Sequence, residues 1–198
     1  NKARSALRFG ELLNSHDWAP DSIGNQSLAI GYNCKASGDF SFARGELTNA
    51  SGDYAFSNGA FSSASGILSY AEGVFNLASG DYSFARGSDN LALNVHSYVI
   101  GSGSTASGVY AKALGLGLDA PSSHEFVIGA FNEKYTPNQD SLWDGQDKLF
   151  VVANGVAYNE RNNALTILKN GKMGLNDSDP DAMLTIRNND SDEIDPFR

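Results

Sequence analysis

The chain repeats itself every fourteen residues over more than half of its length, and this period limits its fold more than any other feature. Eight glycines follow that spacing without a miss, and we expect them to be structural turn glycines: Gly31, Gly45, Gly59, Gly73, Gly87, Gly101, Gly115 and Gly129. A column of alanines is equally regular: Ala36, Ala50, Ala64, Ala78, Ala92, Ala106 and Ala120. A short fixed period of this kind is typical of solenoid proteins, in which each unit stacks on the next.

Within each unit, large and small side chains alternate in stretches such as "DFSFARG" and "DYAFSNG". Such alternation predicts a β-strand. A unit of fourteen residues is too short for a helical crossover between parallel strands, and two glycines inside a helix would cost about 1 kcal/mol each. We therefore predict an all-β fold, a parallel β-roll of about eight coils, each made of strand, turn, short strand and turn.

A second glycine column contains one informative exception. It consists of Gly24, Gly38, Gly52, Gly66, Gly80, Asn94 and Gly108. Asparagine is the non-glycine residue that best tolerates a positive φ. We predict that this column adopts a left-handed turn conformation.

Stacking of the coils brings equivalent side chains together in ladders. One large column contains Phe40, Tyr54, Leu68, Tyr82, His96, Tyr110 and His124, and another contains Leu28, Phe42, Phe56, Tyr70, Phe84, Tyr98, Lys112 and Phe126. Alternating with the latter is a small column: Ala29, Ala43, Ser57, Ala71, Ala85, Val99, Ala113 and Val127. We expect both large columns to share one face of the strand and the small column to face a crowded space. Since a roll has a single interior, we expect the other face to pack against a second copy of the chain; the pattern leaves open which face is which.

Three units, "SLAIGYNCKASG", "SFARGELTNASG" and "SYAEGVFNLASG", resemble the head repeats of YadA-like trimeric autotransporter adhesins. The resemblance covers about residues 23–130 and implies a left-handed β-roll, three copies side by side, displayed on a cell surface. The column before the glycine departs from the family's aliphatic pattern at Arg44, Asn58, Glu72 and Arg86. We expect these four side chains to be exposed and, if the roll contacts a receptor, to carry the specificity.

The flanking segments complete a division into five parts. We predict an N-terminal cap at 1–22 that includes Trp18, the roll at 23–130, a loop at 131–147, a small β domain at 148–188 and a flexible tail at 189–198. Strands are expected around "SALRFG", "KLFVVA", "NALTILK", "KMGL" and "AMLTIR", with Asn170-Gly171 as a hairpin turn. The stretch "KLFVVANGVAYNERNNALTILKNGKMGL" resembles a segment that follows such repeats in phage tail fibres and secreted bacterial fibre proteins, often ahead of a self-cleaving chaperone.

Composition excludes several kinds of partner. The net charge of −9 leaves no basic stripe for nucleic acid or an anionic membrane surface. No run of 18 apolar residues predicts a membrane span. Because the chain begins at Asn1 without a signal peptide, we expect it to be a fragment of a longer protein.

Side chains capable of chemistry are present but not arranged for it. No G-x-S-x-G nucleophile motif opens a helix, and "GSGSTASG" at 101–108 fits an ordinary coil without the helix and Lys-Ser/Thr of a phosphate loop. We therefore predict no catalysis, no cofactor and no metal site.

Three minor features each have two interpretations. Asp39, Asp53 and Asp81 share a column and are either solvated turn carboxylates or cation ligands. His96 and His124 either pack in the aromatic ladder or, if that ladder faces a three-fold axis, form a metal or proton-sensitive site. The single cysteine, Cys34, excludes an internal disulfide and is either a small turn residue or a reactive thiol.

Together these patterns predict a non-enzymatic, extracellular, homotrimeric fibre head that attaches to a protein or glycan receptor on a cell surface or matrix. Two alternatives remain open: the receptor-binding or shaft segment of a phage or injection-system tail fibre, at the fibre tip, and a rigid structural spacer.

Overall fold

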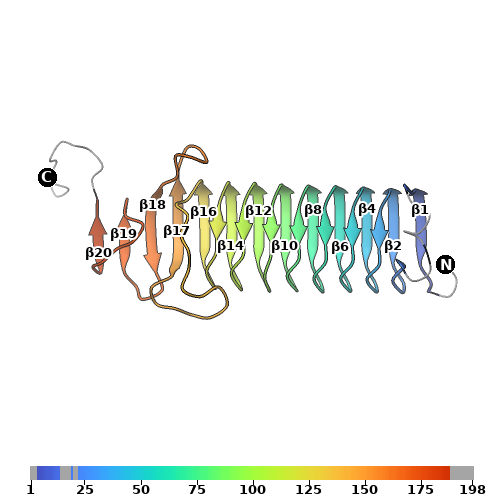
Figure 1. Ribbon diagram of the computed structural model, residues 1–198, viewed down its shortest axis with the longest axis horizontal. Coiled ribbons are helices and arrows are strands. Elements are labelled where there is room, and N and C mark those ends of the chain that lie inside the picture. Colours follow the sequence, from blue (N-terminus) through green and yellow to red (C-terminus); the bar gives the residue numbers. More distant parts are fainter. Residues whose placement is uncertain (1–3, 14–18, 20–21, 188–198) are drawn as a thin grey trace.

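The computed structural model describes residues 4–13, 19 and 22–187, which form a parallel β-solenoid continued by antiparallel strands (Figure 1). The predicted all-β roll of fourteen-residue coils is confirmed. Trp18 and the predicted tail at 189–198 lie outside the described residues.

Each coil contributes one long strand to a 13-stranded sheet. In the roll these strands are β2 (Leu28–Tyr32), β4 (Phe42–Glu46), β6 (Phe56–Ala60), β8 (Tyr70–Val74), β10 (Phe84–Ser88), β12 (Tyr98–Ser102), β14 (Lys112–Leu116) and β16 (Phe126–Ala130). Neighbours pair in parallel and in register, so that Gly45 lies beside Gly59 and Gly59 beside Gly73. The prediction that this glycine column lies in turns is wrong: its members are strand residues, with φ between 104° and 148°.

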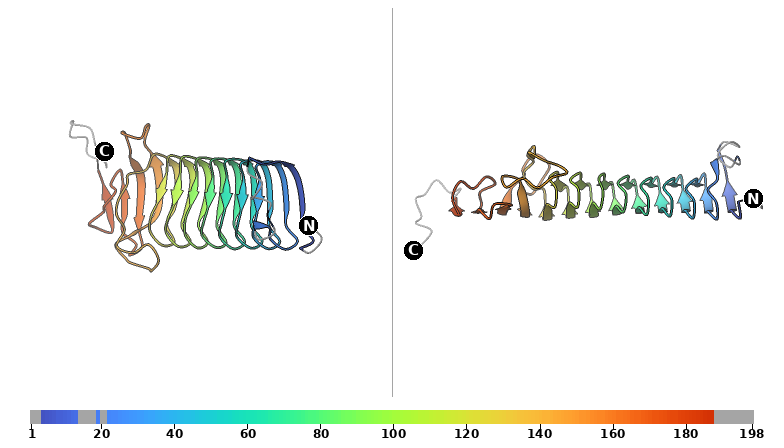
Figure 2. Two further views of the ribbon diagram at one scale, coloured as in Figure 1. Left: turned by 45° about the vertical axis from the view of Figure 1, so that its right-hand side comes forward. Right: turned by 90° about the horizontal axis from the view of Figure 1, so that it is seen from below.

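A second sheet of seven two-residue strands closes each coil. Its members are β3 (Lys35–Ala36), β5 (Asn49–Ala50), β7 (Ser63–Ala64), β9 (Leu77–Ala78), β11 (Leu91–Ala92), β13 (Thr105–Ala106) and β15 (Asp119–Ala120). Seen from below, the roll is narrow, with the long strands along one side (Figure 2).

The long sheet extends beyond the roll at both ends. β1 (Leu7–Glu11) pairs in parallel with β2, and β17 (Lys148–Asn154) pairs in parallel with β16. β18 (Asn163–Leu168) and β19 (Met173–Leu175) then form the predicted antiparallel hairpin around Asn170-Gly171, and β20 (Leu184–Ile186) pairs in parallel with β19. Residues 131–147 contain no strand and loop away from the sheet at this end (Figure 1).

The interior of the roll consists of small side chains. The column of Ala43, Ser57 and Ala71 and the alanines of the second sheet are fully buried, whereas the aromatic side chains of the strands point outward. In the described part of the chain, Phe131 is the one buried aromatic residue, and it follows the last strand of the roll. The structure thereby decides the face that the sequence left open: the small column lies inside the roll, with Val99 and Val127 as its largest members, and the aromatic column lies outside.

The predicted left-handed conformation of the second glycine column is wrong. Gly38 and the equivalent glycines lack a positive φ, and so does Asn94. They are small because of crowding: a Cβ on Gly38 would lie 1.9 Å from the carbonyl oxygen of Gly52 on the next coil.

Left-handed residues occur two positions later, on the bulky side chains. Phe40, Tyr54, Leu68, Tyr82, His96, Tyr110 and His124 have φ between 55° and 61°. They therefore lie in the turn before each long strand and not on the strand face with Phe42, as we had expected. The left-handed conformation costs a non-glycine residue roughly 1–2 kcal/mol, and stacking of successive rings, worth about 0.5–1.5 kcal/mol per pair, offsets part of this cost.

The open first coil is capped by a side chain from β1. Arg8 occupies the position next to Ala29 and points into the end of the roll. Its guanidinium donates to the carbonyl oxygens of Ser27 (3.1 Å) and Ala36 (2.7 Å) and to the Ser27 hydroxyl (2.8 Å). Burial lowers the pKa of Arg8. Both carbonyl oxygens also accept a backbone N–H, from Leu7 and Gly24 respectively, so Arg8 adds a second donor to each at the open end of the roll.

Candidate interaction surfaces

The outward face of the long-strand sheet, which we call the sheet face, carries two columns of large side chains. The first column contains Leu7, Leu28, Phe42, Phe56, Tyr70, Phe84, Tyr98, Lys112, Phe126 and Phe150. Successive rings from Phe42 to Tyr98 stack with centroids 4.6–5.1 Å apart. Stacking leaves each ring half-buried, so the column remains an apolar stripe open to a partner.

The second column of the sheet face contains the four residues predicted to carry specificity. Arg44, Asn58, Glu72 and Arg86 occupy successive rungs, and we call this group the charged belt. Arg44 and Arg86 are exposed, as expected, whereas Asn58 and Glu72 are half-buried. The belt thus lies on the same face as the aromatic stripe and not on a separate receptor surface.

Glu72 is the centre of the belt's hydrogen bonds. Its carboxylate pairs with Arg86 Nε at 3.1 Å and accepts from the Tyr70 hydroxyl at 3.0 Å and from Asn58 Nδ2 at 3.4 Å. Burial, and then the bond to Glu72, raise the pKa of the Tyr70 hydroxyl, which stays protonated as a donor.

The turn residues form a second apolar feature, the turn ladder, which runs from Phe40 to His124. Phe40 and Tyr54 stack at 4.9 Å, and Tyr54 is 54% exposed. His96 is packed between Tyr82 (4.8 Å) and Tyr110 (4.7 Å). The rings present edges to solvent because their faces are occupied by each other. At the far end of the ladder, His124 meets the ring of Trp143 edge-on at 5.9 Å.

The aspartate column braces neighbouring coils. The Asp39 carboxylate accepts from the backbone N–H of Asn25 (2.7 Å), Asp53 from that of Asp39 (2.9 Å) and Asp81 from that of Ile67 (2.8 Å). Hydrogen bonds from the Asn25 side chain and backbone hold the pKa of Asp39 below its usual range. Among residues 4–13, 19 and 22–187, no group of three His, Cys, Asp or Glu side chains could hold a metal ion.

Cys34 lies in the interior and not in a turn. Its thiol donates to the carbonyl oxygen of Gly45 (3.1 Å) and accepts from the Thr48 hydroxyl (3.2 Å). The column continues with Ser62, Asn76 and Asn90, all buried. Burial shields the thiol from solvent oxidants, so a structural role fits better than a reactive one.

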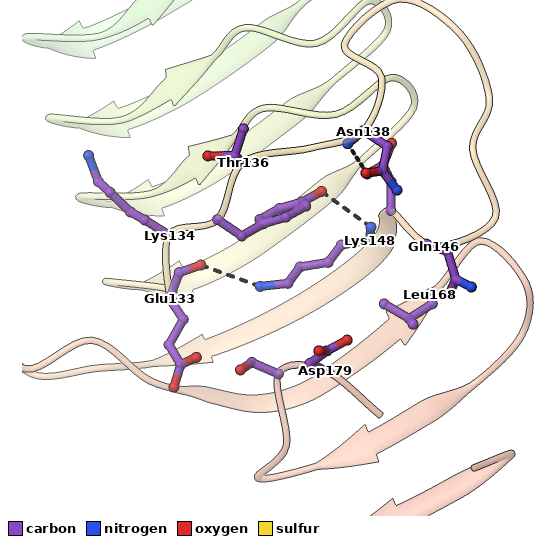
Figure 3. Close-up of a pocket in the computed structure, with 11 residues that line it drawn as sticks. Glu133, Lys134, Thr136, Asn138, Gln146, Lys148, Leu168 and Asp179 are labelled. Atoms are coloured by element: carbon purple, nitrogen blue, oxygen red, sulfur yellow. Dashed lines mark hydrogen bonds between the residues drawn. The ribbon is translucent and has the colours of Figure 1, made fainter. Parts of the chain in front are cut away.

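A cavity of about 340 Å³ lies where the roll meets the C-terminal strands (Figure 3). Lys148 lies along it, with Nζ 4.4 Å from the centre of the Tyr135 ring and 3.5 Å from the carbonyl oxygen of Glu133. Burial lowers the pKa of Lys148. Asp147 fixes the loop by accepting from the backbone N–H of Asn138 (2.7 Å) and pairs with the buried Lys169 at 3.8 Å. Carboxylates and lysines alternate around the cavity, so its charge favours neither an anion nor a cation.

Glu125 is a buried acid beside this cavity that the sequence analysis missed. Its Oε2 accepts from the backbone N–H of Ser122 and from the Tyr135 hydroxyl, each at 3.0 Å, whereas Oε1 has no partner among the described residues. Every other coil has Ser or Ala at this position: Ser27, Ser41, Ala55, Ser69, Ser83, Ser97 and Ala111. That break in an otherwise small column was the signal available in the sequence.

Stability is expected to fall between about pH 4.5 and pH 7 because of Glu125. Burial raises the pKa of Glu125 from 4.5 to about 7. The folded state therefore binds a proton that the unfolded chain releases in this range, and folding is favoured on the acid side. Guanidinium unfolding of the parent and of Glu125→Gln at pH 5 and pH 8 tests this. The variant should gain stability relative to the parent at pH 8, and parallel pH profiles would contradict the assignment.

No helix in the described part of the chain has the length and apolar character needed to cross a bilayer.

Three segments of the roll are similar to a known family of repeats. Residues 22–45, 64–90 and 92–117 match the YadA head domain repeat (2 copies), and all three segments lie within the solenoid. The matches do not extend into β17–β20, and no curated protein matches the chain. The matched repeat is an adhesin structural module without enzymatic activity, which confirms the prediction of a non-enzymatic protein. Within the solenoid, these three segments are similar to the YadA head domain repeat.

Proposed function

We propose that the chain is part of a homotrimeric adhesin head that attaches a bacterial cell to a protein or glycan receptor. Heads of the YadA family are trimeric and exposed on the cell surface. One observation of this chain carries the proposal furthest: small side chains fill the roll, while a column of large apolar side chains, interrupted by Lys112 alone, runs along the sheet face from Leu7 to Phe150.

The sheet face suits self-association better than the turn ladder does. It is two columns wide and flat, and its second column is aliphatic at Ile100, Leu114 and Ile128. The turn ladder is a ridge one residue wide. Burial of apolar surface contributes about 25 cal/mol per Å², so the broader face offers the larger gain. Three sheet faces around a common axis would leave the turn ladders outside for receptor contact.

The parent chain is expected to have a solution mass three times its 21.0 kDa, measured by light scattering. Phe56→Glu, which places a charge between Phe42 and Tyr70 on the sheet face, should reduce the mass to that of a monomer. Tyr54→Glu, two residues away on the exposed turn ladder, is the matched control and should leave the mass unchanged. A monomeric parent, or loss of the trimer in the control alone, would contradict the proposed face.

Attachment is tested by screening the trimer against glycans and matrix proteins. Three sites per head convert weak contacts into firm binding, so signals should fall sharply for monomeric Phe56→Glu. Silence across all ligands would favour the spacer alternative. The tail-fibre resemblance of residues 148–175 remains a prediction, and a chaperone domain downstream in the full-length gene would support it.

A further inference from the structure

The sheet face raises a problem of register for any assembly built on it. Its coils repeat every fourteen residues, and a shift of one copy by one rung, about 4.8 Å, would place nearly equivalent rings opposite each other. Flat repetitive strands specify register weakly. An assembly with a single register therefore needs a feature that differs along the face.

The second column provides such a feature. It is apolar at both ends and polar in the middle, in the order Phe9, Ile30, Arg44, Asn58, Glu72, Arg86, Ile100, Leu114, Ile128 and Val152. Lys112 adds a single charge to the first column. A shift by one rung therefore changes which side chains of the second column lie opposite each other, although it leaves the repeating backbone in the same arrangement.

The belt's hydrogen bonds within the chain are incomplete on the side facing away from the roll. Arg86 reaches Glu72 through Nε, and its side chain is 60% exposed. Within the described residues, the terminal nitrogens of Arg86 and the guanidinium of Arg44 have no acceptor. Arginine presents its donors in a fixed planar fork that suits a second carboxylate.

We propose that the charged belt of Arg44, Asn58, Glu72 and Arg86 contacts the same belt in neighbouring copies and fixes their register. The inference rests on the proposed homotrimer. In an in-register assembly, Arg86 of one copy lies one rung from the Glu72 level of its neighbour, within reach of that carboxylate. A shift of one rung would bring Arg86 of one copy level with Glu72 of its neighbour, but it would also set Arg44 against Ile30 and the neighbour's Arg86 against Ile100. Burying such unpaired charges is strongly unfavourable.

This role follows the way in which polar residues act in other repetitive interfaces. A single polar residue in an apolar seam selects the register of a coiled coil at some expense of stability. The belt would act likewise here, so its loss should relax the register without abolishing association. Receptor contact by the same residues is the competing possibility.

The test maps the register by photo-cross-linking. The probe p-benzoylphenylalanine replaces Phe126, three coils beyond the rung of Arg86, and mass spectrometry of the covalent dimer band identifies the partner residues. For the parent, cross-links should fall on one rung and its immediate neighbours. For Arg44→Ile, Asn58→Ile, Glu72→Ile and Arg86→Ile combined, the trimer mass should persist while cross-links spread over several rungs.

A charge swap serves as the matched control if the combined variant fails to fold. Glu72→Arg with Arg86→Glu retains the pair and should keep a single register, whereas Glu72→Arg alone should reduce the trimer fraction at least tenfold at low salt.

A single register in the combined Ile variant would overturn the belt's role and leave the proposed trimer intact. Monomeric parent chains would overturn both proposals. Loss of receptor binding in Arg44→Ile at unchanged mass and register would assign the belt to the receptor instead.

Discussion

Gly59→Ala is expected to destabilise the roll by roughly 3 kcal/mol or more. Gly59 is the fourth residue of strand β6 and has a φ of +117°, which L side chains rarely adopt. A Cβ there would lie 2.0 Å from the carbonyl oxygen of Gly73 on the next coil. Either the two coils separate, which breaks the ladder, or the backbone of β6 changes conformation.

The measurement is the midpoint of guanidinium unfolding followed by circular dichroism. Ala60→Val is the matched control, because Val74 occupies the same outward column one coil later and a β-branched residue suits a strand. The control should change stability by no more than about 0.5 kcal/mol. Equal effects of the two substitutions would show that the contact between coils at Gly59 is looser than the structure describes.

Asn90→Leu is the second large effect, and we expect a loss of roughly 3 kcal/mol. Asn90 is fully buried, and its amide nitrogen donates to the carbonyl oxygens of Arg86 (2.9 Å) and Gly101 (2.8 Å). Its Oδ1 accepts from the backbone N–H of Ser104 at 3.2 Å. Leucine has a similar volume but would leave these three backbone groups without that partner inside the roll.

Asn90→Ser separates lost hydrogen bonds from lost volume. Ser62, in the same interior column, donates to the carbonyl oxygen of Gly73 and accepts from the backbone N–H of Asn76, each at 3.2 Å. Serine at position 90 can make the equivalent bonds, so the loss should be about half that of leucine. Leucine proving as stable as serine would mean that the interior amide ladder contributes little.

The period, the strands and the parallel stacking were predictable because they depend on local regularities. Glycine and alanine at fixed intervals leave few alternatives to a solenoid, and the Asn170-Gly171 hairpin follows from turn chemistry. The left-handed positions were not predictable, since Asn94 indicated the wrong column. Aromatic residues such as Tyr54 adopt the positive φ because their neighbours on adjacent coils stack with them, an effect that local propensity does not contain.

The junction at the end of the roll was missed for a similar reason. Glu125, Tyr135 and Lys148 are distant in sequence and form one buried cluster because the segment 131–147 returns β17 to the edge of β16. The sequence marked only Glu125, as a large residue in a small column.

By itself, the sequence determined that residues 23–130 form a stack of fourteen-residue β-coils similar to YadA head repeats. Only the tertiary structure decided which side of the strand is inside. Alternation assigns side chains to two faces but does not say how closely the sheets approach. In the folded roll the column of Ala43, Ser57 and Ala71 is fully buried, whereas the rings from Phe42 to Tyr98 stack on the outer face beside the charged belt. Interiors are close-packed, so the narrow space inside each coil takes the small column and leaves the aromatic columns outside.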